Sequence, residues 1–129
     1  MSTDTTASVS THILDTSIGR PAEGVAITLA ARSGFDAQWV TLGGSATDAD
    51  GRCKDLPALP EGTTHVRLDF ETEAYFSKKQ AEAQQDAPRV RDSGAFFPEV
   101  AITFAVKPGE HYHVPLLLNP FGYSVYRGS

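Results

Sequence analysis

Apolar residues recur at every second position in several short segments of this chain, and this period most constrains its fold. The longest alternation runs from Val100 through Ile102 and Phe104 to Val106. Shorter segments with the same pattern span residues 9–14, 25–30, 66–70 and 111–118, and residues 39–42 form a short apolar run of strand-forming residues. Because the side chains of a strand alternate between its two faces, this period indicates strands with one buried face. The chain is therefore predicted to be mainly β.

Turn-forming residues separate the alternating segments, and one stretch breaks the pattern. Gly19-Arg20-Pro21, Gly43-Gly44 and Asp48-Ala49-Asp50-Gly51 are predicted to be turns. The segment from Glu71 to Gln85 is rich in helix formers and is predicted to hold a short helix. About eight short strands with one helix indicate a β-sandwich. We expect a single domain over residues 9–129, after a disordered or extended tail at residues 1–8.

The composition excludes several classes of protein. A formal net charge of -5, with Lys and Arg scattered along the chain, argues against a nucleic-acid partner. The longest apolar runs are about five residues, far below the ~20 that cross a bilayer, and residues 1–10 lack the basic and apolar regions of a secretory signal. One cysteine, Cys53, excludes an internal disulfide framework. We therefore expect a cytoplasmic protein with no membrane partner.

Two of the four histidines lie on an unusual strand face near the end of the chain. Alternation puts Tyr112, Val114, Leu116 and Leu118 on one apolar face, which we expect to lie in the core between the sheets. The opposite face holds His111, His113, Pro115 and Leu117 and carries no charged residue. An outward face that is neither charged nor plainly core indicates a subunit interface or a ligand groove.

Other polar residues are expected on the same side of the sandwich. In the first strand, His12 shares its face with Ser10 and Leu14. If the last two strands pair as a hairpin, Ser124 and Tyr126 join the face that carries the paired histidines. Imidazoles, hydroxyls and the end of the chain would then gather on one outer surface.

The same residues also allow plainer interpretations. His111, beside Glu110, fits a solvated residue at a strand end, and His113 fits a histidine that is hydrogen-bonded within a dimer interface. Arg52 follows a turn and fits an ordinary cation at the start of a strand, and Cys53 fits an inert small residue. Periodicity alone leaves these interpretations open beside that of a ligand site.

Four segments of the chain resemble the 5-hydroxyisourate hydrolases, the transthyretin-related enzymes of urate breakdown. They read THILDTSIGRPAEGVAITL from Thr11, TDADGRC from Thr47, FFPEVAITFAV from Phe96 and EHYHVPLLLNPFGYSVYRGS from Glu110. The terminal Tyr-Arg-Gly-Ser is the most specific of these features, followed by His-Tyr-His. The resemblance covers nearly the whole chain from Ser10 onward.

This resemblance implies a fold, an assembly and a set of site residues. The fold is a transthyretin/prealbumin-like β-sandwich of two four-stranded sheets with one short helix, assembled as a homotetramer whose active sites lie in the channel between dimers. His12, Arg52, His113 and the terminal residues from Tyr126 to Ser129 match the site motif of the family, and His111 matches its His-x-His pattern nearer the channel mouth. The family needs no metal or other cofactor.

The implied activity is the hydrolysis of 5-hydroxyisourate to 2-oxo-4-hydroxy-4-carboxy-5-ureidoimidazoline, by histidine-assisted attack of water on a ring carbonyl. A neutral histidine suits the role of base, and we favour His12, with His113 positioning or relaying protons. Arg52 would bind the carbonyl edge of the ring and the developing oxyanion. Tyr126 would contact the ring, and Ser129 would supply a hydroxyl and the terminal carboxylate. The catalytic candidates are thus His12, Arg52, His111, His113 and Ser129.

Two functions from other classes remain as alternatives. His12, His111 and His113 are a possible three-histidine zinc site of a hydrolase, although no carboxylate or thiolate accompanies them. A transthyretin-like carrier of a small aromatic ligand is the second alternative, although three imidazoles and Arg52 are an unusual lining for apolar binding.

Overall fold

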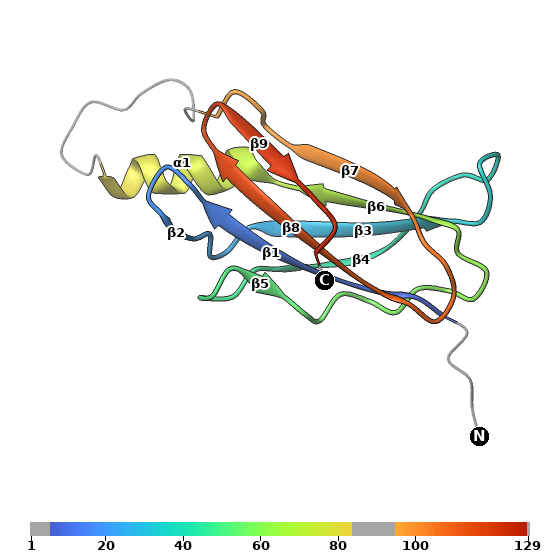
Figure 1. Cartoon of the computed structure of the whole chain (residues 1–129). Helices are drawn as coiled ribbons and strands as arrows, with labels where there is room; N and C mark the ends of the chain where they lie inside the picture. Colours follow the sequence, from blue (N-terminus) through green and yellow to red (C-terminus); the bar gives the residue numbers. More distant parts are fainter. Residues whose placement is uncertain (1–5, 84–94, 129) are drawn as a thin grey trace.

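The computed structural model describes residues 6–83 and 95–128, in which two β-sheets pack against each other (Figure 1). One sheet has the strand order β2-β1-β8-β9, and β5 pairs with β1 beside β2. Its strands are β1 (Ser8–Asp15), β2 (Arg20–Pro21), β5 (Arg52–Cys53), β8 (His111–Asn119) and β9 (Gly122–Val125). The other sheet has the order β4-β3-β6-β7, with β3 (Ala26–Arg32), β4 (Val40–Ala46), β6 (His65–Phe70) and β7 (Val100–Ala105). The predicted β-sandwich is confirmed.

The sheet that carries the histidines has five strands, where four were expected. The difference lies in β2 and β5, which have two residues each and both pair with β1. β5 is held by the turn before it, which Gly51 makes possible. Gly51 has a φ of 74°, and a Cβ atom there would lie 2.4 Å from the carbonyl oxygen of Ile13.

The predicted turn at Gly43-Gly44 is wrong, because both glycines lie inside β4. The register of β4 against β3 shifts at this point, since Leu29 pairs with Gly43 and Ala30 pairs with Thr41. A Cβ atom on Gly44 would lie 2.6 Å from the carbonyl oxygen of Ile27. The glycines therefore permit a bulge and a close approach of two backbones, which is the other common role of glycine in a strand.

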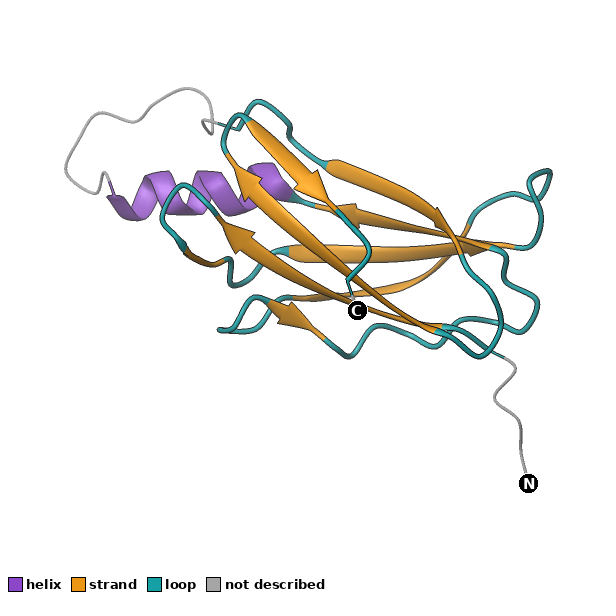
Figure 2. Ribbon diagram, viewed as in Figure 1, coloured by secondary structure: helices purple, strands orange, loops and turns teal. Residues whose placement is uncertain are grey.

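The predicted helix is confirmed as α1 (Thr72–Ala83), which lies at one end of the sandwich (Figure 2). It is fixed by the buried Tyr75, whose hydroxyl donates to Asp15 Oδ2 at 2.7 Å, and by Phe76, which packs into the core. The last two residues of the predicted helical segment lie outside the described residues. The helix is too short and too polar to span a membrane, and no other helix occurs in the described ranges.

The core lies between the sheets and follows the predicted alternation. Its largest fully buried side chains include Ile13 of β1, Leu29 of β3, Phe70 of β6 and Leu116 of β8. Of the predicted tail, residues 1–5 lie outside the described residues, Ala7 is buried and Ser8 already belongs to β1. The domain limits at residues 8 and 9 stay a prediction.

Candidate functional site

The outer face of β1 and β8 brings three of the predicted site residues together. β1 and β8 run parallel, and their register pairs Ser8 with His111, Ser10 with His113 and His12 with Pro115. On the other side of β1, the register pairs His12 with Arg52 of β5. The predicted split of β8 into two faces is confirmed, because Tyr112, Val114, Leu116 and Leu118 are buried in the core.

Serine hydroxyls connect the histidines of β8. Ser10 Oγ lies 2.8 Å from His113 Nδ1 and 2.9 Å from His111 Nε2. Ser8 Oγ lies 2.6 Å from the other nitrogen of His111, Nδ1. A continuous chain of hydrogen bonds therefore runs from the half-buried His113 to the exposed His111 and ends at the exposed Ser8.

His12 is oriented by the turn that precedes β5. Its Nε2 lies 3.0 Å from the carbonyl oxygen of Asp50. Because a carbonyl oxygen only accepts hydrogen bonds, Nε2 carries the proton, and in the neutral ring the lone pair is on Nδ1. The same turn is tied together by the carboxylate of Asp48, which accepts from the backbone N–H of Asp50 at 2.9 Å and from that of Arg52 at 3.0 Å.

Arg52 offers an exposed guanidinium beside these histidines. Within the described ranges its side chain has no hydrogen-bond or ion-pair partner, so its donors are available to a ligand. A hollow of about 460 Å³ opens here, lined by Ser10, Thr11, Arg52, Lys54, His111 and His113. Its size is that of a small-molecule site.

The environment of His113 favours a neutral ring. Burial lowers the pKa of His113 below its ordinary value, and the positive charges of His12, Arg52 and His111 lower it further. A histidine that stays neutral at physiological pH can accept a proton, as a general base must.

The last described residues lie along β8 and cover part of the histidine face. The N–H of Gly128 donates to the carbonyl oxygen of His113 at 2.7 Å, and the N–H of Tyr126 donates to that of Pro115 at 3.4 Å. A Cβ atom on Gly128 would lie 2.9 Å from Cδ2 of the His113 ring. The same Cβ atom would lie 3.2 Å from Cδ and Cγ of Pro115, so Gly128 packs on Pro115, which is buried although its strand position faces outward. Ser129 lies outside the described residues, so its predicted role stays a prediction.

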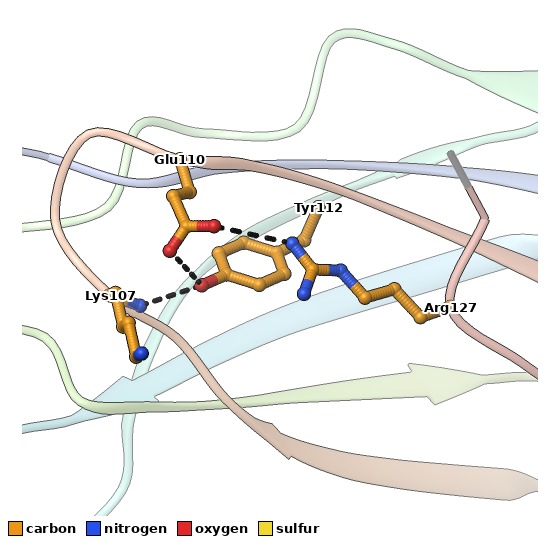
Figure 3. Close-up of polar contacts among 4 residues, drawn as sticks. All are labelled: Lys107, Glu110, Tyr112 and Arg127. Atoms are coloured by element: carbon orange, nitrogen blue, oxygen red, sulfur yellow. Dashed lines mark hydrogen bonds and ion pairs between the residues drawn. The ribbon is translucent and has the colours of Figure 1, made fainter.

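The side chain of Arg127 reaches toward the ring of Tyr112 and the carboxylate of Glu110 (Figure 3). Its guanidinium lies 4.5 Å from the ring centre of Tyr112, and its Nη2 pairs with Glu110 Oε1 at 3.4 Å. The hydroxyl of Tyr112 accepts from the backbone N–H of Lys107 at 2.8 Å and donates to Glu110 Oε2 at 3.3 Å. These contacts anchor the C-terminal segment to the start of β8.

Tyr126 is not among the residues that line the histidine hollow. The predicted hairpin places Ser124 opposite Leu117, and the same register continues past the end of β9, because the N–H of Tyr126 donates to the carbonyl oxygen of Pro115 and Gly128 forms a bridge with His113. Tyr126 is exposed and lines a second, more apolar hollow of about 250 Å³ at the edge of the sandwich, between β7 and β9. The predicted contact between Tyr126 and a ligand bound at the histidines stays a prediction.

The sequence did not single out Ser8, Ser10 or Lys54 as site residues. The two serines lie at alternate positions on the face of His12, which is the only signal that could have found them.

Within the described residues, no three His, Cys, Asp or Glu side chains lie close enough together to hold a metal ion.

The chain is similar to known proteins over nearly its full length. Residues 9–128 match the model of the HIUase/Transthyretin family. A 5-hydroxyisourate hydrolase of Salmonella dublin is 41% identical over 123 residues, which cover 94% of this chain and 80% of that protein. The structure of Klebsiella pneumoniae 5-hydroxyisourate hydrolase is 34% identical, with a TM-score of 0.71 and coverage of 95% of this chain and 99% of the other.

A transthyretin has the same fold at lower identity. The crystal structure of transthyretin from Sparus aurata is 27% identical, with a TM-score of 0.71 and coverage of 93% of this chain and 95% of the other. The two solved structures thus have equal TM-scores and differ in sequence identity. The fold does not distinguish a 5-hydroxyisourate hydrolase from a transthyretin here, and that distinction depends on the site residues.

Proposed function

The chain belongs to the HIUase/transthyretin family, and on that premise we propose that it hydrolyses 5-hydroxyisourate to 2-oxo-4-hydroxy-4-carboxy-5-ureidoimidazoline in urate degradation. One observation carries the proposal: an unpaired guanidinium, Arg52, lies in register with His12 and lines the same hollow as His113, whose pKa is lowered by burial and by its positive neighbours. Enzymes of this activity are among the relatives with the higher identity. The chain is accordingly an enzyme, a cyclic amide hydrolase.

The reaction adds water to a ring carbonyl and breaks the bond from that carbon to a ring nitrogen. The base takes one proton from the water, the new C–O bond forms, and the leaving nitrogen receives a proton as the C–N bond breaks. We propose His113 as the base, in place of the His12 favoured by the sequence, because it lines the hollow and has the lowered pKa.

His12 and Arg52 would bind the substrate and stabilise charge. Arg52 presents a planar set of donors that matches the carbonyl edge of the ring and the oxygen on which negative charge develops. His12 lies next to it, with its Nε2 fixed by the carbonyl of Asp50. Tyr126 and Ser129 remain proposed ligand contacts, which would be completed by the assembly of several chains.

A direct assay tests the function. Urate is oxidised by urate oxidase to generate 5-hydroxyisourate, and the decay of its absorbance is followed with and without the protein. We expect a decay far faster than the spontaneous one. A decay at the spontaneous rate would contradict the hydrolase and leave the carrier as the better interpretation.

The pH dependence of turnover reports the state of His113. The lowered pKa of His113 means that the ring stays neutral as the pH falls through the ordinary histidine value of about 6.5. We therefore expect the acid limb of the kcat/KM profile to lie below that value, and to move to higher pH in Arg52→Gln, because a positive neighbour is lost. An acid limb at or above the ordinary value would assign the base to another group.

We also propose a homotetramer, supported by the uncharged outer face of β8 and by the apolar hollow at the edge between β7 and β9. Sedimentation velocity at micromolar concentration should give the mass of four chains. A monomer would contradict both the tetramer and a site shared between chains.

The cytoplasm remains the proposed location, supported by the lack of a disulfide framework.

Turnover is expected to be independent of metal, which separates the proposal from a zinc hydrolase. Both ring nitrogens of His111 are engaged by serine hydroxyls and are not positioned as metal ligands. Dialysis against a strong chelator should leave kcat unchanged. A loss of activity that added zinc restores would support the three-histidine alternative.

A further inference from the structure

We infer that Ser10 and His111 form a proton pathway that connects His113 to bulk water, so that the exposed ring of His111 carries the positive charge during turnover. The inference rests on the proposed function and assigns a role in proton transfer to Ser10, a residue outside the catalytic set predicted from the sequence. Ser8, at the outer end of the pathway, assists by binding His111.

The geometry of the pathway is continuous and asymmetric. Ser10 Oγ bridges His113 Nδ1 at 2.8 Å and His111 Nε2 at 2.9 Å, both within ordinary hydrogen-bond length. Ser10 is only 9% exposed, whereas His111 is exposed. The bridging hydroxyl is therefore shielded from water, while the far end of the pathway is in contact with it.

The single hydroxyl proton of Ser10 allows two hydrogen-bonding arrangements of the pathway. Ser10 can donate to only one imidazole, so in a fully bonded chain it accepts from the other. When it donates to His111 Nε2, it accepts from His113 Nδ1, and the lone pair of neutral His113 is on Nε2. When it donates to His113 Nδ1, His113 carries its proton on Nε2. The two arrangements differ only in the positions of protons.

Both halves of the reaction use this exchange. Water gives a proton to His113 Nε2 as its oxygen bonds to the ring carbonyl; Nδ1 passes a proton to Ser10, and Ser10 passes its own to His111 Nε2. In the second half, His113 Nε2 gives its proton to the leaving nitrogen as the C–N bond breaks. His111 then returns a proton to Ser10, and Ser10 returns one to Nδ1. One proton has moved from water to nitrogen, and all residues are restored.

The electrostatic surroundings of the two histidines favour the positive charge on His111 over His113. His113 faces His12 and Ser10 of β1, Arg52 of β5, His111 on its own strand and the backbone of Gly128, and Lys54 lines the same hollow. None of these groups is an anion that would stabilise an imidazolium at His113. At His111 the ring is exposed, so water solvates the charge.

The first test compares two substitutions of Ser10. Ser10→Ala removes the bridge, and Ser10→Thr keeps a hydroxyl at the same position. We expect kcat to fall by about 10–10² in Ser10→Ala, with KM little changed, and to recover substantially in Ser10→Thr. A structural defect would affect KM and the melting temperature as well, and both are measured.

The second test uses His111→Gln, which keeps hydrogen-bonding capacity but cannot take up a proton, with His65→Gln on the other sheet as the matched control. We expect kcat to fall in His111→Gln, to recover as imidazole is added to the buffer, and to stay unchanged in the control. If the wild type is active and both Ser10→Ala and His111→Gln are fully active, the pathway is overturned and the proposed hydrolase function stands. A wild type without turnover overturns both proposals.

Discussion

Replacing Arg52 with glutamate is expected to lower kcat/KM for 5-hydroxyisourate by at least about 10²–10³, the usual loss for one donor to a developing oxyanion. The substitution places a carboxylate where the substrate presents carbonyl oxygens. It would also raise the pKa of His113, since one of the charges that lower it is reversed. The fold should be retained, because the Arg52 side chain is exposed and its backbone contact to Asp48 does not depend on the side chain.

Arg20→Glu is the matched control for this prediction. Arg20 is also an exposed arginine in a two-residue strand that pairs with β1, but it lies opposite Asp15 and away from the histidines. The two variants change the net charge equally, so a loss of turnover in Arg52→Glu alone assigns the effect to the site. If folded Arg52→Glu turns over near the wild-type rate, then Arg52 is an ordinary solvated cation and not a site residue.

The strands could be predicted because their signals are local. Alternation along β7 and β8 shows in the sequence which side chains face the core, and the structure follows it. The turn from Asp48 to Gly51 was also readable, since its aspartates and glycine are typical turn residues. Gly43-Gly44 was misread because glycine serves both turns and bulges, and only the backbone of β3 distinguishes the two roles.

The connections within the site could not be predicted, because they depend on pairing between distant residues. Ser10 and His113 are far apart in the sequence, and their contact requires β1 and β8 to be parallel in one particular register. A shift by one residue would turn Ser10 to the other face of the sheet. Tyr126 shows the opposite case, since the alternation predicted from the sequence continues beyond the end of β9 to the bridge of Gly128 with His113.

Gly128→Ala is expected to lower kcat by about 10–10², because the new methyl group displaces the His113 ring. Its Cβ would lie 2.9 Å from His113 Cδ2 and 3.2 Å from Cδ and Cγ of Pro115. Cδ2 is bonded to Nε2, the nitrogen proposed to meet the substrate water. The ring must therefore tilt at the side where the chemistry takes place, and its bond from Nδ1 to Ser10 is strained or lost.

Gly122→Ala provides the comparison that isolates this effect. Gly122 belongs to β9, has no positive φ, and a Cβ atom there meets nothing within 4 Å. Both variants add one methyl group to a glycine near the end of the chain, so any general effect on the unfolded chain is shared. We expect Gly122→Ala to turn over as the wild type does.

The melting temperature distinguishes displacement of the His113 ring from loosening of the C-terminal segment. Gly128 lies at the margin of the sheet, and the segment around it stays anchored by the contact of Arg127 with Tyr112 and Glu110. A crowded contact typically costs about 1–3 kcal/mol, so Gly128→Ala should remain folded under assay conditions while its kcat falls. If Gly128→Ala has the melting temperature and the full kcat of the wild type, then the C-terminal segment does not control the position of His113.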